Sequence, residues 1–194
     1  MNSLPKVILF DGHGTLTYPK RSTFRIYCEL TKKFNCAHSL EYVREQYVAL
    51  RRKHYLFLQQ RAKDQQDVTW EEDRQHWFSL ESQVFKDLGI DTDYEQLSMD
   101  ILTNYMTPVN QKVYSDVPKI LHYLTSKGYI LGVITNSDSR YKKILHYHGI
   151  ERYFKYFFIS SETKFKKPSK QVYQYASDVI GKPLSSIWYI GDQL

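Results

Sequence analysis

Residues 7–16 read Val-Ile-Leu-Phe-Asp-Gly-His-Gly-Thr-Leu. The four consecutive apolar residues from Val7 to Phe10 predict a strand covered on both faces, as in a parallel sheet. The run ends at Asp11, so its carboxylate is expected at the carboxyl edge of the sheet, where open α/β sheets bind ligands. The two glycines that follow let the backbone come close to a ligand. From this turn alone, a purely structural strand-to-helix turn containing an Asp stays an open alternative.

Three later apolar runs also end in polar residues, and a lysine-rich segment lies between the last two of them. The runs are Gly132-Val133-Ile134 before Thr135-Asn136, Tyr156-Phe157-Phe158-Ile159 before Ser160-Ser161, and Ile187-Trp188-Tyr189-Ile190 before Gly191-Asp192, and the lysine-rich segment is Lys164-Phe165-Lys166-Lys167-Pro168. Each of these pieces is weak evidence when it is taken singly, because a polar residue at a strand end is common.

The segment from about residue 22 to about residue 107 has helical spacing and no obvious strand. Trp70, Trp77 and Val84 repeat every seven residues, which predicts one helix, and Thr69 with Glu72 predicts a capping box at its start. Further helices are predicted over about 22–34, from residue 40 to near 61, and just after residue 93. Their aromatic stripes are interpreted as core.

After Pro108 the pattern changes to alternating helices and strands. Strands are predicted over 129–134, 156–159 and 186–190, and helices over about 117–127, 139–148 and 169–180. Alternation of this kind indicates a parallel sheet with right-handed crossovers. The predicted fold class is therefore α/β, a Rossmann-like parallel sheet with an inserted helical cap. The predicted α/β core domain comprises residues 1–18 and 109–194, and the predicted helical cap comprises residues 19–108.

Composition narrows the class of protein. With 194 residues, 42% of them hydrophobic, the chain is long and apolar enough to bury a core. The net charge of +6 fits either an ordinary basic surface or attraction of anionic substrates such as phosphates. The sequence contains no nucleic-acid-binding motif and no apolar stretch long enough to span a bilayer. We therefore expect neither nucleic acid nor a membrane as a partner. Cys28 and Cys36 form no disulfide framework, and a cytoplasmic location is the default, with nucleus and mitochondrion left open.

Taken together and in order, these pieces closely resemble the haloacid dehalogenase (HAD) superfamily. The family pattern is a strand followed by D-x-D-G-T-L, a strand followed by S/T-N, a Lys before Pro, and a strand followed by G-D. The resemblance covers nearly the whole chain. It implies a HAD-like core with a helical cap inserted after the first strand. It also implies that the strand before Asp11 is central, so that Asp11, Thr135 and Asp192 meet at one crevice.

The resemblance also implies roles for individual residues. Asp11 matches the nucleophile and a Mg²⁺ ligand, Asp192 matches a second Mg²⁺ ligand, and the backbone carbonyl of His13 matches a third. Thr135 and Lys167 match the groups that bind and stabilise the transferring phosphoryl, with Lys164 and Lys166 as rivals for the lysine. The remaining substrate-binding residues implied are Gly12 and Asn136.

Residue 13 departs from the family pattern. Phosphatases of the family carry a second Asp at this position, which protonates the leaving oxygen and later activates water, whereas the dehalogenases commonly carry an aromatic residue. An unperturbed His titrates near pH 6.5, so His13 is a candidate catalytic acid and base. A positively charged His13 beside a Mg²⁺ site would instead be repulsive. Loss of chemistry with the fold kept is a further alternative.

The second departure lies at the carboxyl end, where the sequence stops after Gly191-Asp192-Gln193-Leu194. The family continues with another Asp, a helix and at least one more strand. The expectation is a fragment of a longer gene product or a degenerate paralogue. The strand Ile187–Ile190 would lie near an uncovered edge, where self-association or another chain could supply a partner strand.

The expected activity is Mg²⁺-dependent hydrolysis of a small phosphorylated metabolite through an aspartyl-phosphate at Asp11. One alternative is a metal-independent 2-haloacid dehalogenase, in which the same Asp attacks carbon. The other is an inactive HAD-fold protein that binds a ligand or a partner. The substrate itself is not predicted.

Overall fold

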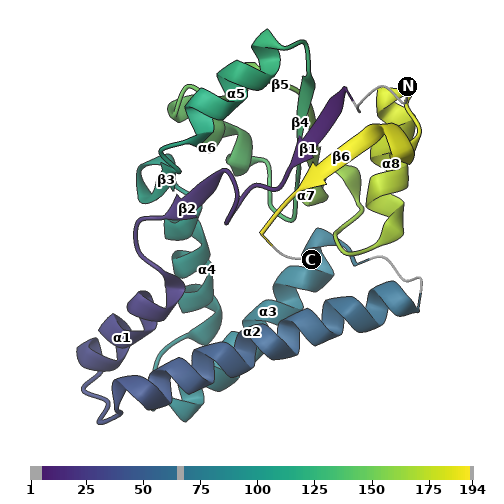
Figure 1. Ribbon diagram of the computed structural model, residues 1–194. Coiled ribbons are helices and arrows are strands. Elements are labelled where there is room, and N and C mark those ends of the chain that lie inside the picture. Colours follow the sequence, from purple (N-terminus) through teal and green to yellow (C-terminus); the bar gives the residue numbers. More distant parts are fainter. Residues whose placement is uncertain (1–5, 65–67, 193–194) are drawn as a thin grey trace.

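The computed structural model describes residues 6–64 and 68–192. Within them, four parallel strands form the central sheet in the order β5-β4-β1-β6 (Figure 1). The strands are β1 (Val7–Phe10), β4 (Ile130–Thr135), β5 (Phe154–Ile159) and β6 (Ile187–Ile190). The strand before Asp11 therefore lies between the strands that precede Thr135 and Asp192. This order confirms the predicted parallel α/β fold.

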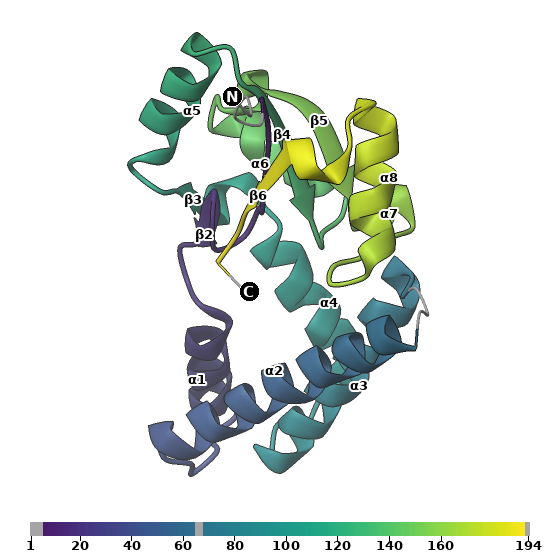
Figure 2. The same ribbon diagram turned by 45° about the vertical axis from the view of Figure 1, so that its right-hand side comes forward.

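Helices cover both faces of the sheet (Figure 2). The helices of this part are α5 (Val117–Ser126), α6 (Arg140–Tyr147), α7 (Ser160–Thr163) and α8 (Lys170–Ile180). Because successive side chains of a strand point to opposite faces, Ile8 and Phe10 pack with α5 and α6, whereas Val7 and Leu9 pack with α8. None of these four side chains is more than 5% exposed, which confirms that β1 is covered on both faces.

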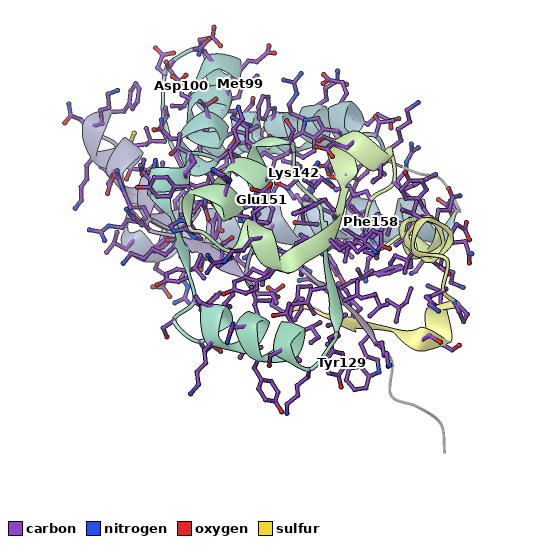
Figure 3. The ribbon with its side chains drawn as sticks, turned by 90° about the horizontal axis from the view of Figure 1, so that it is seen from above. Met99, Asp100, Tyr129, Lys142, Glu151 and Phe158 are labelled. Atoms are coloured by element: carbon purple, nitrogen blue, oxygen red, sulfur yellow. The ribbon has the colours of Figure 1, made fainter. Side chains whose placement is uncertain are left out.

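The two outer strands of the described sheet differ in how well they are covered. On β5, Phe158 faces α8 (Figure 3), and its ring centroid lies 6.1 Å from that of Tyr175. On β6, by contrast, Trp188 and Ile190 are each 41% exposed. The edge position of β6 agrees with the sequence-based expectation, and self-association through it stays a prediction.

Four helices between residues 23 and 105 form the cap, which lies beyond the carboxyl ends of the strands (Figure 1). They are α1 (Thr23–Lys33), α2 (Leu40–Lys63), α3 (Trp70–Asp87) and α4 (Tyr94–Tyr105). The predicted capping box is confirmed at the start of α3, where Thr69 and Glu72 bond reciprocally. Tyr27, Val43 and Phe85 are completely buried in a core separate from those of the sheet. The exact bounds of cap and core stay a prediction.

Two short strands connect the cap to the sheet domain, and the sequence patterns did not predict them. They are β2 (Thr17–Pro19) and β3 (Gln111–Val113), which pair antiparallel. Single turns of 3-10 helix complete the described fold: η1 (Pro108–Asn110), η2 (Glu151–Tyr153) and η3 (Leu184–Ser186). Among the residues that are described, no helix is both long and apolar enough to cross a bilayer.

A carboxyl group lies inside the cap core. Glu81 of α3 is 1% exposed and accepts a hydrogen bond from the Tyr27 hydroxyl of α1. Burial raises the pKa of Glu81 to about 7, although the Tyr27 bond opposes the shift. At neutral pH this group therefore titrates inside the folded cap.

We expect Glu81→Gln to change how stability depends on pH. Between the unfolded pKa of 4.5 and the folded pKa of about 7, the folded chain holds a proton that the unfolded chain releases, so the free energy of unfolding falls as pH rises. Across this pH range the wild-type chain loses about 3 kcal/mol of its free energy of unfolding. Denaturant unfolding at pH 5 and pH 8 should therefore show Glu81→Gln gaining stability relative to wild type at the higher pH. The exposed Glu71→Gln is the control, and an equal response of the two variants would contradict the prediction.

Candidate active site at the ends of β1, β4 and β6

Asp11 is fixed at the carboxyl end of β1 by backbone and side-chain contacts. Its backbone N–H donates to the carbonyl oxygen of Ile190 at 2.8 Å, which ties the turn to β6. Its Oδ1 accepts the backbone N–H of Gly12 at 2.6 Å and lies 2.7 Å from the ammonium nitrogen of Lys167. The Asp11 side chain is 14% exposed, so the carboxylate is reachable at the surface while its charge is paired.

The turn after Asp11 packs directly against the end of β4. A Cβ at Gly12 would lie 2.7 Å from Oγ1 of Thr135 and 2.7 Å from the Tyr141 ring, so only glycine fits. Thr135 is the last residue of β4 and is 3% exposed. The structure therefore brings the backbone beside Asp11 and the Thr135 hydroxyl together, as the sequence-based site requires.

Asn136 holds the lysine loop. Its amide nitrogen donates to the Lys167 carbonyl oxygen at 2.8 Å, and its amide oxygen accepts the Lys167 backbone N–H at 2.8 Å. Both polar ends of this side chain thus bond to the backbone of Lys167. A role in substrate binding stays a prediction for Asn136, and its contacts indicate a role in orienting Lys167.

Of the three candidate lysines, Lys167 is the one in contact with Asp11. Burial lowers the pKa of the Lys167 ammonium, and the Asp11 and Asp192 carboxylates oppose that shift. Lys166 instead pairs with Asp73 of the cap, and Lys164 is exposed in a left-handed conformation with φ of 65°. The lysine just before Pro168 is therefore the cation placed to act at Asp11.

Asp192 lies against the same turn from the β6 side. Gly14 has a φ of +89°, and a Cβ there would lie 2.5 Å from Oδ2 of Asp192. A side chain at residue 14 would fill the space beside this carboxylate. Three strand ends, carrying Asp11, Thr135 and Asp192, thus converge around one turn.

The donor set suits a hard cation with few protein ligands. The described residues contain no group of three or more His, Cys, Asp or Glu side chains that could hold a metal ion. The Asp192 carboxylate borders the space that Gly14 leaves open, and the Asp11 carboxylate and the His13 carbonyl are further oxygen donors carried by the same turn. Mg²⁺ is commonly bound by one or two carboxylates plus waters and substrate phosphate. These residues therefore fit Mg²⁺.

His13 is held among aromatic side chains. Its ring centroid lies 5.2 Å from that of Tyr105 in the cap and 4.7 Å from that of Tyr141. Its Nδ1 lies 3.5 Å from Oγ1 of Thr17. Burial lowers the pKa of His13 to about 4, although Asp138 raises it. The ring is therefore neutral at pH 7, so His13 adds no positive charge beside Asp11.

Sequence reasoning missed Tyr189. Its hydroxyl oxygen accepts from the Lys167 ammonium at 3.0 Å, and that ammonium lies 5.4 Å from the ring centroid. Burial and the Asp11 carboxylate raise the pKa of the Tyr189 phenol, so it stays protonated. The sequence held one signal for this residue: because side chains alternate along a strand, Tyr189 points to the face of the sheet opposite to that of Ile190. The convergence of Lys167 on this hydroxyl depends on the fold and had no signal in the sequence.

Comparison with known proteins places this geometry in a family. The chain matches the model of the haloacid dehalogenase-like hydrolases over residues 5–194. It is 26% identical to the zebrafish (Danio rerio) haloacid dehalogenase-like hydrolase domain-containing protein 3 over 189 residues, which covers 95% of this chain and 76% of that protein. Three solved structures with the same fold extend the comparison.

The first is a predicted phosphoglycolate phosphatase from Haemophilus somnus, with a TM-score of 0.66, 18% identity and coverage of 99% of this chain and 79% of that one. The second is the L-2-haloacid dehalogenase from Xanthobacter autotrophicus with chloropropionic acid covalently bound (TM-score 0.66, 16% identity, 96% and 69% coverage). The third is the HAD hydrolase YfnB from Bacillus subtilis bound to magnesium, with a TM-score of 0.68, 19% identity and coverage of 98% of this chain and 81% of that one. Since the family model spans the sheet, the cap and all the strand ends described above, the chain belongs to the haloacid dehalogenase-like hydrolases.

Proposed function

We propose that this hydrolase cleaves a small phosphate monoester, with Mg²⁺, through a covalent ester on Asp11. The observation that carries the proposal is the 2.7 Å contact between the Asp11 carboxylate and the Lys167 ammonium at the end of β1. A cation in this place pairs with the attacking carboxylate and offsets the charge that builds on a phosphoryl group. Magnesium in a structure of the same fold adds support for the cofactor.

The proposed first step is attack of an Asp11 carboxylate oxygen on phosphorus. The bond from phosphorus to the ester oxygen breaks, and that oxygen leaves with the electron pair and takes up a proton from solvent water. Water then attacks the phosphorus of the acyl phosphate, which releases inorganic phosphate and restores the carboxylate. Lys167 and the Thr135 hydroxyl bind the phosphoryl oxygens during both steps. Mg²⁺ held by Asp11, Asp192 and the His13 carbonyl would supply further positive charge at those oxygens.

The cap is placed to choose the substrate. Tyr105, at the end of α4, lies against His13, so the cap reaches the residue two positions after the nucleophile. Burial raises the pKa of the Tyr105 phenol to about 12, which keeps it a neutral hydrogen-bond donor. The group attached to the phosphate would therefore meet a neutral, aromatic wall.

Dependence on the metal is the direct test of this function. With an aryl phosphate as substrate, we expect phosphate release with Mg²⁺ and a rate at least about 10²-fold lower when the metal is chelated, because the single Lys167 ammonium would then face two carboxylates and the phosphate. Phosphate release is followed colorimetrically with and without chelator. Turnover that is unchanged by chelation would contradict the Mg²⁺-dependent mechanism.

A second candidate is hydrolysis of a 2-haloacid. The observation favouring it is His13, which leaves the site without the second carboxylate expected of a phosphatase and packs among aromatic rings. Here the Asp11 oxygen would attack the substrate carbon, the halogen would leave as halide with the bonding electrons, and water would hydrolyse the ester. Halide release from a 2-haloacid in the presence of chelator would support this candidate over the phosphatase.

A further inference from the structure

The cap contacts the lysine loop at a second place, away from Asp11. The Lys166 ammonium is 5% exposed and forms an ion pair with the carboxylate of Asp73 on α3. It also lies 5.5 Å from the ring centroid of Trp70, the first residue of that helix. Lys166 therefore extends from the sheet domain into the cap, where its ammonium contacts the Asp73 carboxylate and the Trp70 ring.

Asp73 of α3 contacts both Lys166 and a residue of the neighbouring cap helix α2. Its other oxygen lies 3.1 Å from Nε2 of His54 on α2, and the residue is 8% exposed. Removing a charge from water is costly unless a partner compensates it. If the cap moved away from the sheet domain, Lys166 would lose the Asp73 carboxylate and the Trp70 ring, and Asp73 would keep only His54 as its partner. The pair is formed only when the cap is docked on the loop.

The same loop carries the lysine that touches Asp11. Lys166 and Lys167 are adjacent, and the Lys167 backbone is clamped on its other side by Asn136. Around this point, cap residues Leu58 and Ala62 pack on the loop and leave a cavity of only about 10 Å³. A shift of the cap at this contact would therefore move the backbone from which the Lys167 side chain extends.

We propose that Asp73 and Lys166 are positioning residues, which dock the cap on the lysine loop and thereby set the place of Lys167 at Asp11. The inference rests on the proposed function for the role of Lys167. The docking contact is a property of the folded chain and is measurable without any substrate. A mispositioned reacting group typically costs about 10²-fold in rate. The contact between Lys166 and Asp73 would therefore affect the reaction rate although neither residue touches the substrate.

Hydrogen exchange at the Lys167 backbone amide tests the docking contact. In Asp73→Asn we expect this amide to exchange about tenfold faster or more than in wild type, because the buried ammonium loses its counter-charge and the loop opens more often. The matched control is Glu71→Gln, which removes an exposed carboxylate that pairs within α3 with Arg74. Equal exchange in both variants and wild type would overturn the proposal. Since this readout needs no turnover, a failed phosphatase assay would refute the proposed function and leave this test decisive.

A double-mutant cycle tests the coupling to the site. Lys166→Met keeps the stem of the side chain and removes the charge, and it replaces Asp73→Asn as the test variant should that protein fail to fold. Each single variant is expected to lose about 10- to 100-fold in kcat with little change in KM, since Lys167 acts on the transition state. The double variant should lose no more than the worse single variant. Losses that multiply would show that the two residues act independently and would overturn the proposal.

Discussion

Asp11→Asn is expected to lower turnover by at least about 10³-fold, because an amide oxygen does not form the covalent ester that a carboxylate forms. The substitution is isosteric, and the amide oxygen still accepts the Gly12 N–H that Oδ1 accepts in the native turn. What it removes is the negative charge that faces the Lys167 ammonium at 2.7 Å. The loss therefore reports on the chemistry of the carboxylate and not on the shape of the turn.

The assay follows phosphate release at saturating aryl phosphate with Mg²⁺, alongside thermal unfolding of each protein. Asp116→Asn is the matched control, since Asp116 lies in the sheet domain, is exposed and makes no capping bond to α5. Mass spectrometry of acid-quenched wild type is expected to find a phosphoryl group on the peptide containing Asp11. A folded Asp11→Asn variant that keeps a tenth of the wild-type rate would rule out Asp11 as nucleophile.

The strands of the sheet were predictable because local sequence determines them. Four apolar residues that end at Asp11 are a local signal for β1, because a strand that is covered on both faces carries apolar side chains on both of them. The capping box at Thr69 and Glu72 is equally local, and it opens α3 as predicted. The order of the strands was not a local property. It came from the resemblance to the family, and the pairing of β1 with both β4 and β6 confirms it.

The β2–β3 pair could not be predicted in this way. Each strand has three residues, β2 ends at Pro19, and Gln111 of β3 is completely buried although it is polar. Proline and glutamine are poor strand signals, and three residues are too few to show alternation. The pair exists because the two chain segments that enter and leave the cap lie side by side.

The division of work between the adjacent lysines also depends on tertiary structure. Sequence order favoured Lys167 through its place before Pro168, but no pattern distinguishes a lysine at the nucleophile from a lysine in the cap. The structure separates them: Lys167 contacts Asp11, and Lys166 contacts Asp73, which is 93 residues earlier in the chain. Contacts between an inserted domain and its host arise from their packing, which periodicity within either segment does not encode.

His13→Asp is expected to raise the rate of aryl phosphate hydrolysis by about 10²-fold or more, the range of a well-placed general acid and base. At pH 7 the native imidazole has a pKa of about 4, so it carries no second proton to give to a leaving oxygen. A carboxyl group in the same half-buried place would have its pKa raised by burial and by Asp138 and lowered by Lys167. Such a group exchanges a proton with the leaving oxygen and then with water.

His13→Asn is the matched control, because it has the size of Asp without a titratable proton and loses the same contacts with Tyr105 and Tyr141. Initial rates of phosphate release between pH 5 and 8 would be compared for the wild type and both variants. Only the Asp variant should gain, and its rate should follow the ionisation of a carboxyl group. If Asp and Asn give equal rates, residue 13 does not limit proton transfer, and the neutral histidine is compatible with the chemistry of the native site. A gain confined to Asp would instead identify the imidazole as the reason for slow phosphate turnover, since Asp11, Thr135 and Lys167 are the same in all three proteins.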